Sequence, residues 1–185
     1  MRITILTCAF TLFAATTFAT AANAAVIGAN GGGFHVQHQL RIAAPPAKVW
    51  EMVLSPGRWW SSEHSWSKNA ANMTIQPSAG GCWCERWSGG QAEHMRVVHI
   101  TPMTMVRMRG GLGPLTGLGL DGVMTWTLTD TPDGQTSVTL DYIVSGYSER
   151  GFAGLSKAVD GVLAEAVNRL QMYVQTGSAT ARATQ

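Results

Sequence analysis

The feature that most constrains the fold is one long amphipathic segment at the end of a chain that otherwise looks strand-like. Residues 152–175 carry apolar side chains at intervals of three and four, which are Leu155, Val159, Val162, Ala166, Leu170 and Tyr173. This spacing predicts one helix with a single apolar face. A helix of that length can lie across a whole antiparallel sheet and leave a gap in which a small molecule binds. The pattern therefore predicts a binding cavity more directly than it predicts a reaction.

The segments before this helix are typical of strands joined by turns. Residues 34–42 alternate between apolar and polar side chains, and Pro45-Pro46 then favours the start of a short helix. A second short helix or turn is expected at Arg58-Trp59-Trp60. Six further strands are predicted over residues 73–76, 82–87, 92–100, 103–109, 123–129 and 138–144. The order of elements predicts an α+β domain over residues 34–176.

The first 24 residues are typical of a secretory signal peptide. A short charged start is followed by an apolar run over residues 3–18, and Ala22-Asn23-Ala24 is a good cleavage site. The run is short and broken by threonines, which argues against a membrane anchor. We expect cleavage after Ala24 and a periplasmic or secreted protein.

Two further segments are expected to lack regular structure. Residues 25–33 are rich in glycine and predict a flexible linker, and the polar residues 177–185 predict a disordered tail. The chain has 13 basic and 11 acidic residues, a net charge of +2 that falls to +1 without Arg2. This balance favours neither nucleic acid nor an anionic membrane as a partner. A monomer and a weak dimer both remain open.

Cys82 and Cys84 would be the two cysteines of the mature chain. An exported protein meets an oxidising compartment, so a bridge has to be considered. Residues i and i+2 of an extended strand lie about 6.6–6.8 Å apart, which is near the upper limit for a disulfide. A bridge would need a bent backbone. We therefore expect two buried free thiols, with a disulfide as the alternative.

A hairpin turn predicts one candidate pair of functional side chains. A two-residue turn at Gly89-Gly90 would bring Glu85 opposite His94 and Arg86 opposite Glu93, and both pairs are charge-complementary. A carboxylate–imidazole pair facing a cavity can act as general acid or base, or can hydrogen-bond a ligand. The alternative is an ion pair on the outer sheet face, because a one-residue slip exchanges the two faces.

An aromatic cluster and a glycine-rich segment are further candidates. Trp59, Trp60 and Trp66 surround His64, and they would either line a cavity mouth or cap the core where the short helices meet the sheet. Residues 110–122 combine six glycines with leucines. Such a loop is either a lid over a site or a wide turn packed on the core.

Four segments resemble one known superfamily. They read APPAKVWEMVLSPGRWW, GGCWCERW with GGQAEHMRVV, GLGPLTGLGLDGVMTWTL, and VTLDYIVSGY. They look like the START/polyketide cyclase (SRPBCC) superfamily, in a polyketide cyclase/dehydrase or chaperone-ATPase-activator-like branch. The resemblance implies a helix-grip fold, in which a seven-stranded antiparallel sheet wraps around the long C-terminal helix with a hydrophobic cavity between. It implies no single reaction, because members bind lipids, sterols, polyketides and hormones and only some catalyse.

The expected ligand contacts combine the cavity walls with the candidates above. The walls are Trp83, Met124, Trp126, Tyr142, Leu155, Val159 and Val162, with Glu85 and His94 as polar anchors and Trp59, Trp60, His64 and Trp66 near the mouth. The C-x-C sequence with His94 or His64 offers metal ligands, but no fourth ligand follows, so no metal is expected. No phosphate-binding or nucleophile-elbow motif occurs, and no cofactor is expected.

The sequence favours an exported binding protein for a hydrophobic, lipid- or polyketide-like molecule. One alternative is a cyclase- or dehydratase-like enzyme that uses Glu85 and His94 as acid and base. Another is a protein-interaction module that docks through Trp59, Trp60 and Trp66. A cavity with a buried Glu–His pair would favour the first two hypotheses. A filled core with three exposed tryptophans would favour the last.

Overall fold

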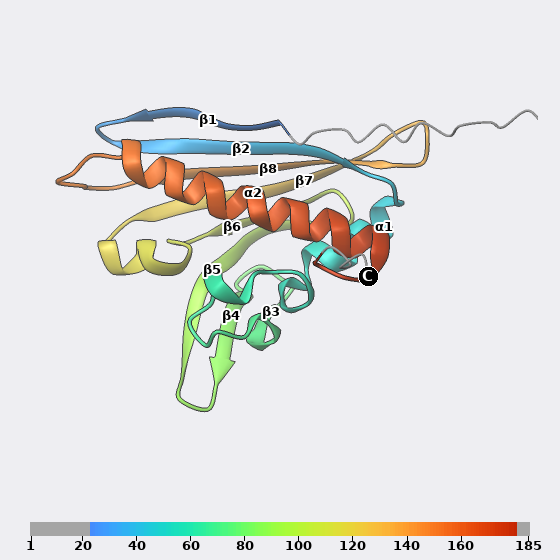
Figure 1. Cartoon of the computed structure of the whole chain (residues 1–185), viewed down its shortest axis with the longest axis horizontal. Helices are drawn as coiled ribbons and strands as arrows, with labels where there is room; N and C mark the ends of the chain where they lie inside the picture. The colour runs from blue at the N-terminus through green and yellow to red at the C-terminus, as the bar shows by residue number, and fades with distance from the viewer. Residues whose placement is uncertain (1–22, 181–185) are drawn as a thin grey trace, which may run out of the picture.

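Eight antiparallel strands form one sheet, and the long helix α2 (Ala153–Thr176) lies across it (Figure 1). The computed structural model describes residues 23–180. The strand order is β1-β2-β8-β7-β6-β5-β4-β3, so every strand pairs with a sequence neighbour except at β2–β8. That pairing joins the N-terminal hairpin to the last strand. The predicted α+β architecture, with a sheet that grips a C-terminal helix, is confirmed.

The alternating segments of the sequence form the strands. They are β1 (Asn23–Asn30), β2 (Gly33–Ile42), β3 (Met73–Ile75), β4 (Cys82–Trp87), β5 (Gly90–Thr101), β6 (Met105–Arg109), β7 (Asp121–Asp130) and β8 (Thr136–Ser145). On β2 the buried side chains recur at every second residue, from Phe34 to Ile42. This is the pattern of a strand with one face on the core.

The strand β1 corrects the prediction of a seven-stranded sheet and of a flexible linker over residues 25–33. Residues 25–30 pair with β2, and Gly31-Gly32 forms the two-residue turn between them. The physical reason is that two glycines between β-forming segments favour a tight hairpin as well as a linker. Of the predicted signal peptide, residues 1–22 lie outside the described residues, and Asn23 and Ala24 begin β1. Cleavage after Ala24 stays a prediction.

One α-helix and three short turns connect β2 to β3. The helix α1 (Pro46–Val53) begins at a proline, as predicted, and buries Val49, Met52 and Val53. The second predicted helix is the single 3-10 turn η1 (Pro56–Arg58). It is followed by two more such turns, η2 (Ser62–His64) and η3 (Ala70–Asn72). We define residues 59–68 as the tryptophan loop. It contains η2 and lies between η1 and η3 in the sequence.

The helix α2 follows the predicted range within one residue at each end, and Gly177 ends it with a φ of 76°. Its buried residues are Ser156, Leu163, Ala166, Val167, Leu170 and Val174. The predicted stripe is therefore split: Ala166 and Leu170 face the core, while Leu155, Val159 and Val162 are half-buried. Within residues 23–180, no helix is long and apolar enough to cross a membrane. Residues 181–185 of the predicted tail lie outside the described residues.

Candidate functional site

A cavity of about 450 Å³ lies between α2, the tryptophan loop and the glycine-rich segment after β6. That segment forms the turn η4 (Gly113–Leu118). The volume falls within the range of about 300–1,000 Å³ that is typical of small-molecule sites. Four elements contribute lining residues. From η4 and its flank come Leu112, Gly113, Pro114 and Leu115, and from α2 come Leu155, Ala158, Val159, Val162 and Leu163. The tryptophan loop contributes Trp60, Glu63, His64, Ser65, Trp66 and Lys68, and β5 contributes His94.

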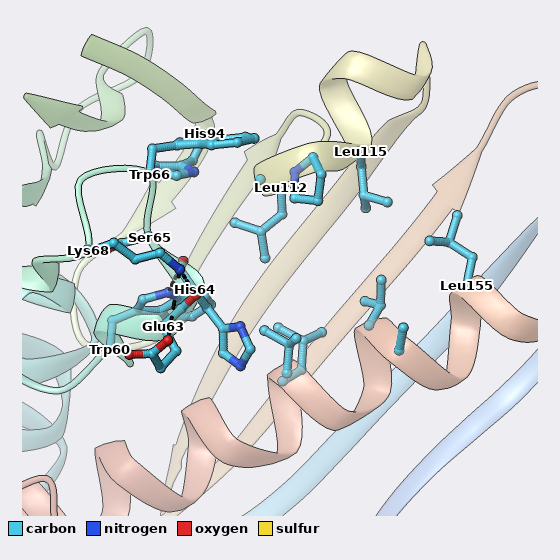
Figure 2. Close-up of a pocket in the computed structure, with 16 residues that line it drawn as sticks. Trp60, Glu63, His64, Ser65, Trp66, Lys68, His94, Leu112, Leu115 and Leu155 are labelled. Atoms are coloured by element: carbon cyan, nitrogen blue, oxygen red, sulfur yellow. Dashed lines mark hydrogen bonds and ion pairs between the residues drawn. The ribbon is translucent and has the colours of Figure 1, made fainter. Parts of the chain in front are cut away.

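The cavity has an apolar end and a polar end (Figure 2). Leu115 and Leu155 lie toward one end, on η4 and on α2, and Leu112 lies between Leu115 and His94. His94 and Trp66 lie at the other, beside the tryptophan loop. An elongated molecule with one polar end group would match this distribution.

Seven of the predicted ligand-contact residues line the cavity and six do not. The seven are Trp60, His64, Trp66, His94, Leu155, Val159 and Val162. Trp59, Trp83, Glu85, Met124, Trp126 and Tyr142 are instead at most 2% exposed and are absent from the cavity wall. The predicted contact of these six residues with a ligand stays a prediction, since none of them lines this cavity.

Four tryptophans near the cavity pack in an aromatic ladder. Trp83, Trp60, Trp59 and Trp126 follow one another with ring centroids 5.2, 5.7 and 6.0 Å apart, each pair in an edge-to-face arrangement. The indole of Trp59 also donates to the Met52 carbonyl at 2.5 Å. Trp60 is the member of this ladder that lines the cavity. The tryptophan cluster was expected either to cap the core or to line the cavity mouth. Trp59 caps the core, and Trp60 does both.

The sequence reasoning missed the cavity residues of the glycine-rich segment. Leu112 and Leu115 are buried against the core and also line the cavity, so the lid and the packed turn are one structure. Tyr142 fixes it: its hydroxyl accepts from the Leu112 amide at 2.9 Å and donates to the Gly110 carbonyl at 3.0 Å. Burial raises the pKa of Tyr142 to about 12. This tyrosine positions a cavity wall without lining it.

The remaining missed residues come from two other elements. Ala158 and Leu163 extend the α2 wall, and Glu63, Ser65 and Lys68 belong to the tryptophan loop. The signal for Ala158 was its place between Leu155 and Val162 on one helical face. The three polar residues gave no signal, because nothing in the sequence says which side of an irregular loop faces inward.

Glu85 and His94 are neighbours, as predicted, but through a different register. The turn is Ser88-Gly89, since Trp87 pairs with Gly90, so Glu85 lies opposite Ala92. The pairing shifts between Trp83 and Cys84, which leaves His94 as an extra residue of β5. This β-bulge turns both His94 and Met95 inward, and they are 3% and 1% exposed. Bulges re-aim side chains in this way next to functional sites.

The two side chains form a buried hydrogen-bonded pair. His94 Nε2 lies 3.1 Å from Glu85 Oε2, and Glu85 is fully buried. Glu85 also accepts from the backbone amides of Ser67 at 2.6 Å and Trp66 at 3.1 Å. Glu85 thus holds the tryptophan loop against the hairpin and orients the imidazole that lines the cavity.

The hydrogen bonds decide the charge state of this pair. Burial by itself raises the pKa of Glu85, but hydrogen bonds from Ser67, Trp66 and His94 outweigh it and leave the pKa below its ordinary value. Burial lowers the pKa of His94, and the attraction of Glu85 offsets this only in part. At neutral pH the pair is a carboxylate and a neutral imidazole. Because a carboxylate can only accept, Nε2 carries the imidazole proton and Nδ1 keeps its lone pair.

Cys82 and Cys84 form a disulfide, so the prediction of two free thiols is wrong. Their Cα atoms are 5.3 Å apart. The bulge opposite them supplies the bent backbone that the extended-strand argument lacked. Among residues 23–180, one group of side chains lies close enough to hold a metal ion, namely Cys82, Cys84 and Glu93. Both sulfurs of that group are engaged in the bridge, and neither His64 nor His94 belongs to it.

Comparisons with solved structures identify the same fold in distant proteins. A conserved protein of unknown function, EF2215 from Enterococcus faecalis, has 13% identity and a TM-score of 0.57, with 89% of this chain and 82% of that chain covered. CalU16 from Micromonospora echinospora has 18% identity and a TM-score of 0.54, covering 84% and 85%. Aha1 from Colwellia psychrerythraea, solved as a dimer, has 19% identity and a TM-score of 0.52, covering 77% and 97%.

The family comparison is more specific than these structural likenesses. No curated protein matches the chain. The model of the family described as "Polyketide cyclase / dehydrase and lipid transport" matches residues 33–175, from the start of β2 to the end of α2. This range contains the whole cavity and the Glu85–His94 pair, and the resemblance seen in the sequence is confirmed. The chain therefore belongs to the polyketide cyclase/dehydrase and lipid transport family.

Proposed function

We propose that the protein binds a hydrophobic small molecule, lipid- or polyketide-like, in the cavity between α2, η4 and the tryptophan loop. The observation that carries this proposal is a 450 Å³ space whose walls are mostly aliphatic and aromatic side chains. Each CH₂ group transferred from water to such walls contributes about 0.8 kcal/mol. Family membership supports the same class of ligand.

Part of the apolar surface of α2 in the cavity wall is not covered by other side chains in the free protein. Ala158 is exposed, and Leu155, Val159 and Val162 are half-buried although they belong to an apolar helical face. An apolar ligand would cover this surface without moving the core, because the lid is already fixed by Tyr142. We therefore expect binding to a preformed site rather than folding around the ligand.

A second candidate function is acid/base catalysis on the bound molecule. The Glu85–His94 pair favours it, since a neutral imidazole oriented by a carboxylate is a suitable general base. In this reading His94 is the catalytic residue, and Glu85 is a positioning residue because it is not part of the cavity wall. This proposal gives the two residues of the predicted acid/base pair different roles.

The third hypothesis, a docking surface made of three tryptophans, has little support. Trp59 and Trp60 are 1% and 3% exposed, and only Trp66 of the three is exposed, at 53%. The combination of a cavity with a buried Glu–His pair is the one expected for ligand binding.

We also propose that the protein is exported. The signal-peptide pattern of residues 1–24 supports a periplasmic or secreted protein. The Cys82–Cys84 bridge is consistent with it, because disulfides persist in oxidising compartments.

Native mass spectrometry of the full-length gene product, purified from its own host, tests the binding proposal. We expect a co-purified apolar molecule of a few hundred daltons. The variant Ala158→Trp should lose that molecule, because the indole would fill the space beside Leu155 and Val162. The variant Lys157→Trp is the matched control, since Lys157 is exposed and lies outside the cavity wall. Equal retention of the ligand by both variants would contradict the assignment of the site.

A further inference from the structure

The polar end of the cavity contains a hydrogen-bond acceptor without a partner. Among the side chains of the described residues, His94 Nδ1 is buried and makes no hydrogen bond. The other ring nitrogen is engaged with Glu85, at 3.1 Å. The imidazole is part of the cavity wall, so a bound molecule can become the partner of Nδ1 once a neighbouring side chain moves enough to uncover this atom. A buried polar atom left unpaired is unfavourable, and a ligand that pairs it gains the difference.

The surroundings of His94 restrict which ligand group can pair with it. Trp66 and Trp60 contribute apolar surface at the same end, and the carboxylate of Glu85 lies directly behind the imidazole. A ligand carboxylate would bring a second negative charge toward Glu85 and would have no proton to donate. A ketone or an ether would place an acceptor against an acceptor. A hydroxyl is uncharged, donates a hydrogen bond and is small enough for a tightly packed corner.

We propose that His94 selects ligands that carry an uncharged hydroxyl, alcoholic or phenolic, on the end that enters the cavity between Trp66 and β5. The hydroxyl donates its proton to His94 Nδ1, and the rest of the molecule extends along α2 toward Leu115 and Leu155. This inference rests on the proposed binding function and names the chemistry that the site prefers.

A second buried ring nitrogen without a partner lies near His94. The indole Nε1 of Trp83 is also buried without a partner, and its ring centroid lies 5.9 Å from that of His94. Trp83 is not part of the cavity wall, however. The selection is therefore assigned to His94 alone.

Two isomeric probes test the inference. 1-Decanol and 1-methoxynonane have the same atoms and nearly the same shape, but only the alcohol can donate a hydrogen bond. Their dissociation constants can be measured by displacement of Nile red from the cavity. We expect the alcohol to bind the wild-type protein about ten-fold more tightly, the effect of one hydrogen bond to a buried acceptor. Equal affinities, or tighter binding of the ether, would overturn the inference.

Two matched variants locate the effect. His94→Asn and His94→Leu have similar shapes, and both remove the donor to Glu85, but only Asn retains an oxygen near the position of Nδ1. We expect the preference for the alcohol to persist in His94→Asn and to disappear in His94→Leu. A preference that is unchanged in His94→Leu would assign it to another group and refute the role of His94. Should either variant fail to fold in thermal melts, the wild-type comparison of the isomers decides by itself.

The design separates this inference from the proposal on which it depends. If both isomers bind with the same affinity, the apolar cavity stands and the hydroxyl selection fails. If neither isomer displaces the dye and no ligand co-purifies with the protein, the binding function fails as well.

Discussion

The two halves of helix α2 carry the same kind of apolar pattern but serve different purposes. In the C-terminal half, Val167 and Leu170 are fully buried against the sheet. In the N-terminal half, Leu155 and Val159 are only half-buried and border the cavity. The comparison teaches that one end of this sheet–helix interface is filled to provide stability, while the other is left open for a ligand.

The largest expected effect on the free energy of unfolding comes from placing a charge in each half of α2 in turn. Val167→Asp should cost about 4 kcal/mol or more of unfolding free energy, because the carboxylate would be buried without a partner. Val159→Asp should cost less than about 1.5 kcal/mol, since that side chain can reach water in the cavity. Urea denaturation of both variants measures the two values. Similar losses would mean that the two halves of α2 are equally packed, and the comparison would fail.

The same reasoning revises the expectation for Val162. If the whole predicted stripe faced the core, Val162→Asp would cost several kcal/mol. The structure places Val162 in the cavity wall and half-buried, so its loss should resemble that of Val159.

A second prediction concerns Glu85, which holds the tryptophan loop beside the cavity. Glu85→Gln should cost about 2–3 kcal/mol, because an amide cannot replace the charged acceptor of the Trp66 and Ser67 amides and of His94. The loss should appear as local loosening of the tryptophan loop, seen as faster amide exchange at Trp66 and Ser67. Glu149→Gln, the same substitution at an exposed carboxylate, is the matched control. Unchanged exchange in Glu85→Gln would show that the loop does not depend on this carboxylate.

Much of this architecture could be predicted because it depends on local periodicity. The alternation of β2 and the three-four spacing of α2 each report one buried face, and neither depends on distant residues. The proline start of α1 and the Gly177 stop are equally local signals. The boundaries of these elements were therefore close to those observed.

The candidate site could be predicted only in part, because its details depend on packing between distant segments. The sequence indicated that Glu85 and His94 are neighbours, but the bulge at His94 could not be read from pairing rules. That bulge also brings Cys82 and Cys84 close enough for a bridge. Whether Trp126 or Val159 would border the cavity depended on how the four tryptophans stack, which no spacing rule specifies.

A third prediction addresses the bridge. Replacing Cys82 and Cys84 together with serine should cost about 1.5 kcal/mol, the chain-entropy value for so short a loop. Because the disulfide spans the strand opposite the bulge, the affinity for 1-decanol should fall as well, through altered placement of His94. Alkylation in denaturant without reductant gives the thiol count of the wild-type protein first. Two reactive thiols there would show that the bridge is absent from the protein in solution.

The smallest effect concerns pH. Burial lowers the folded-state pKa of His94, and of His38, which lies 3.1 Å from Asp160 of α2. The unfolded chain then binds protons that the folded chain does not, so stability is complete above the ordinary value of 6.5 and falls as the pH drops below it. The lowered pKa of Glu85 adds a further loss below its ordinary value of 4.5.

Thermal melts of the wild type and of His94→Asn between pH 7.5 and 5 measure this dependence. We expect a shallower decline in the variant, which retains the contribution of His38. A wild-type stability that rises with acidification would show that these imidazoles are protonated in the folded protein.

The most direct test of the central claim is a crystal structure of the protein soaked with 1-decanol. The account predicts electron density for the chain between α2 and η4, along Leu115 and Leu155, with the hydroxyl within hydrogen-bond distance of His94 Nδ1. Among the lining side chains, only those that cover His94 Nδ1 should move from their positions in the free protein, because this atom has almost no accessible surface there. A cavity closed by Trp66 or Leu115, or a decanol molecule bound elsewhere on the surface, would contradict it.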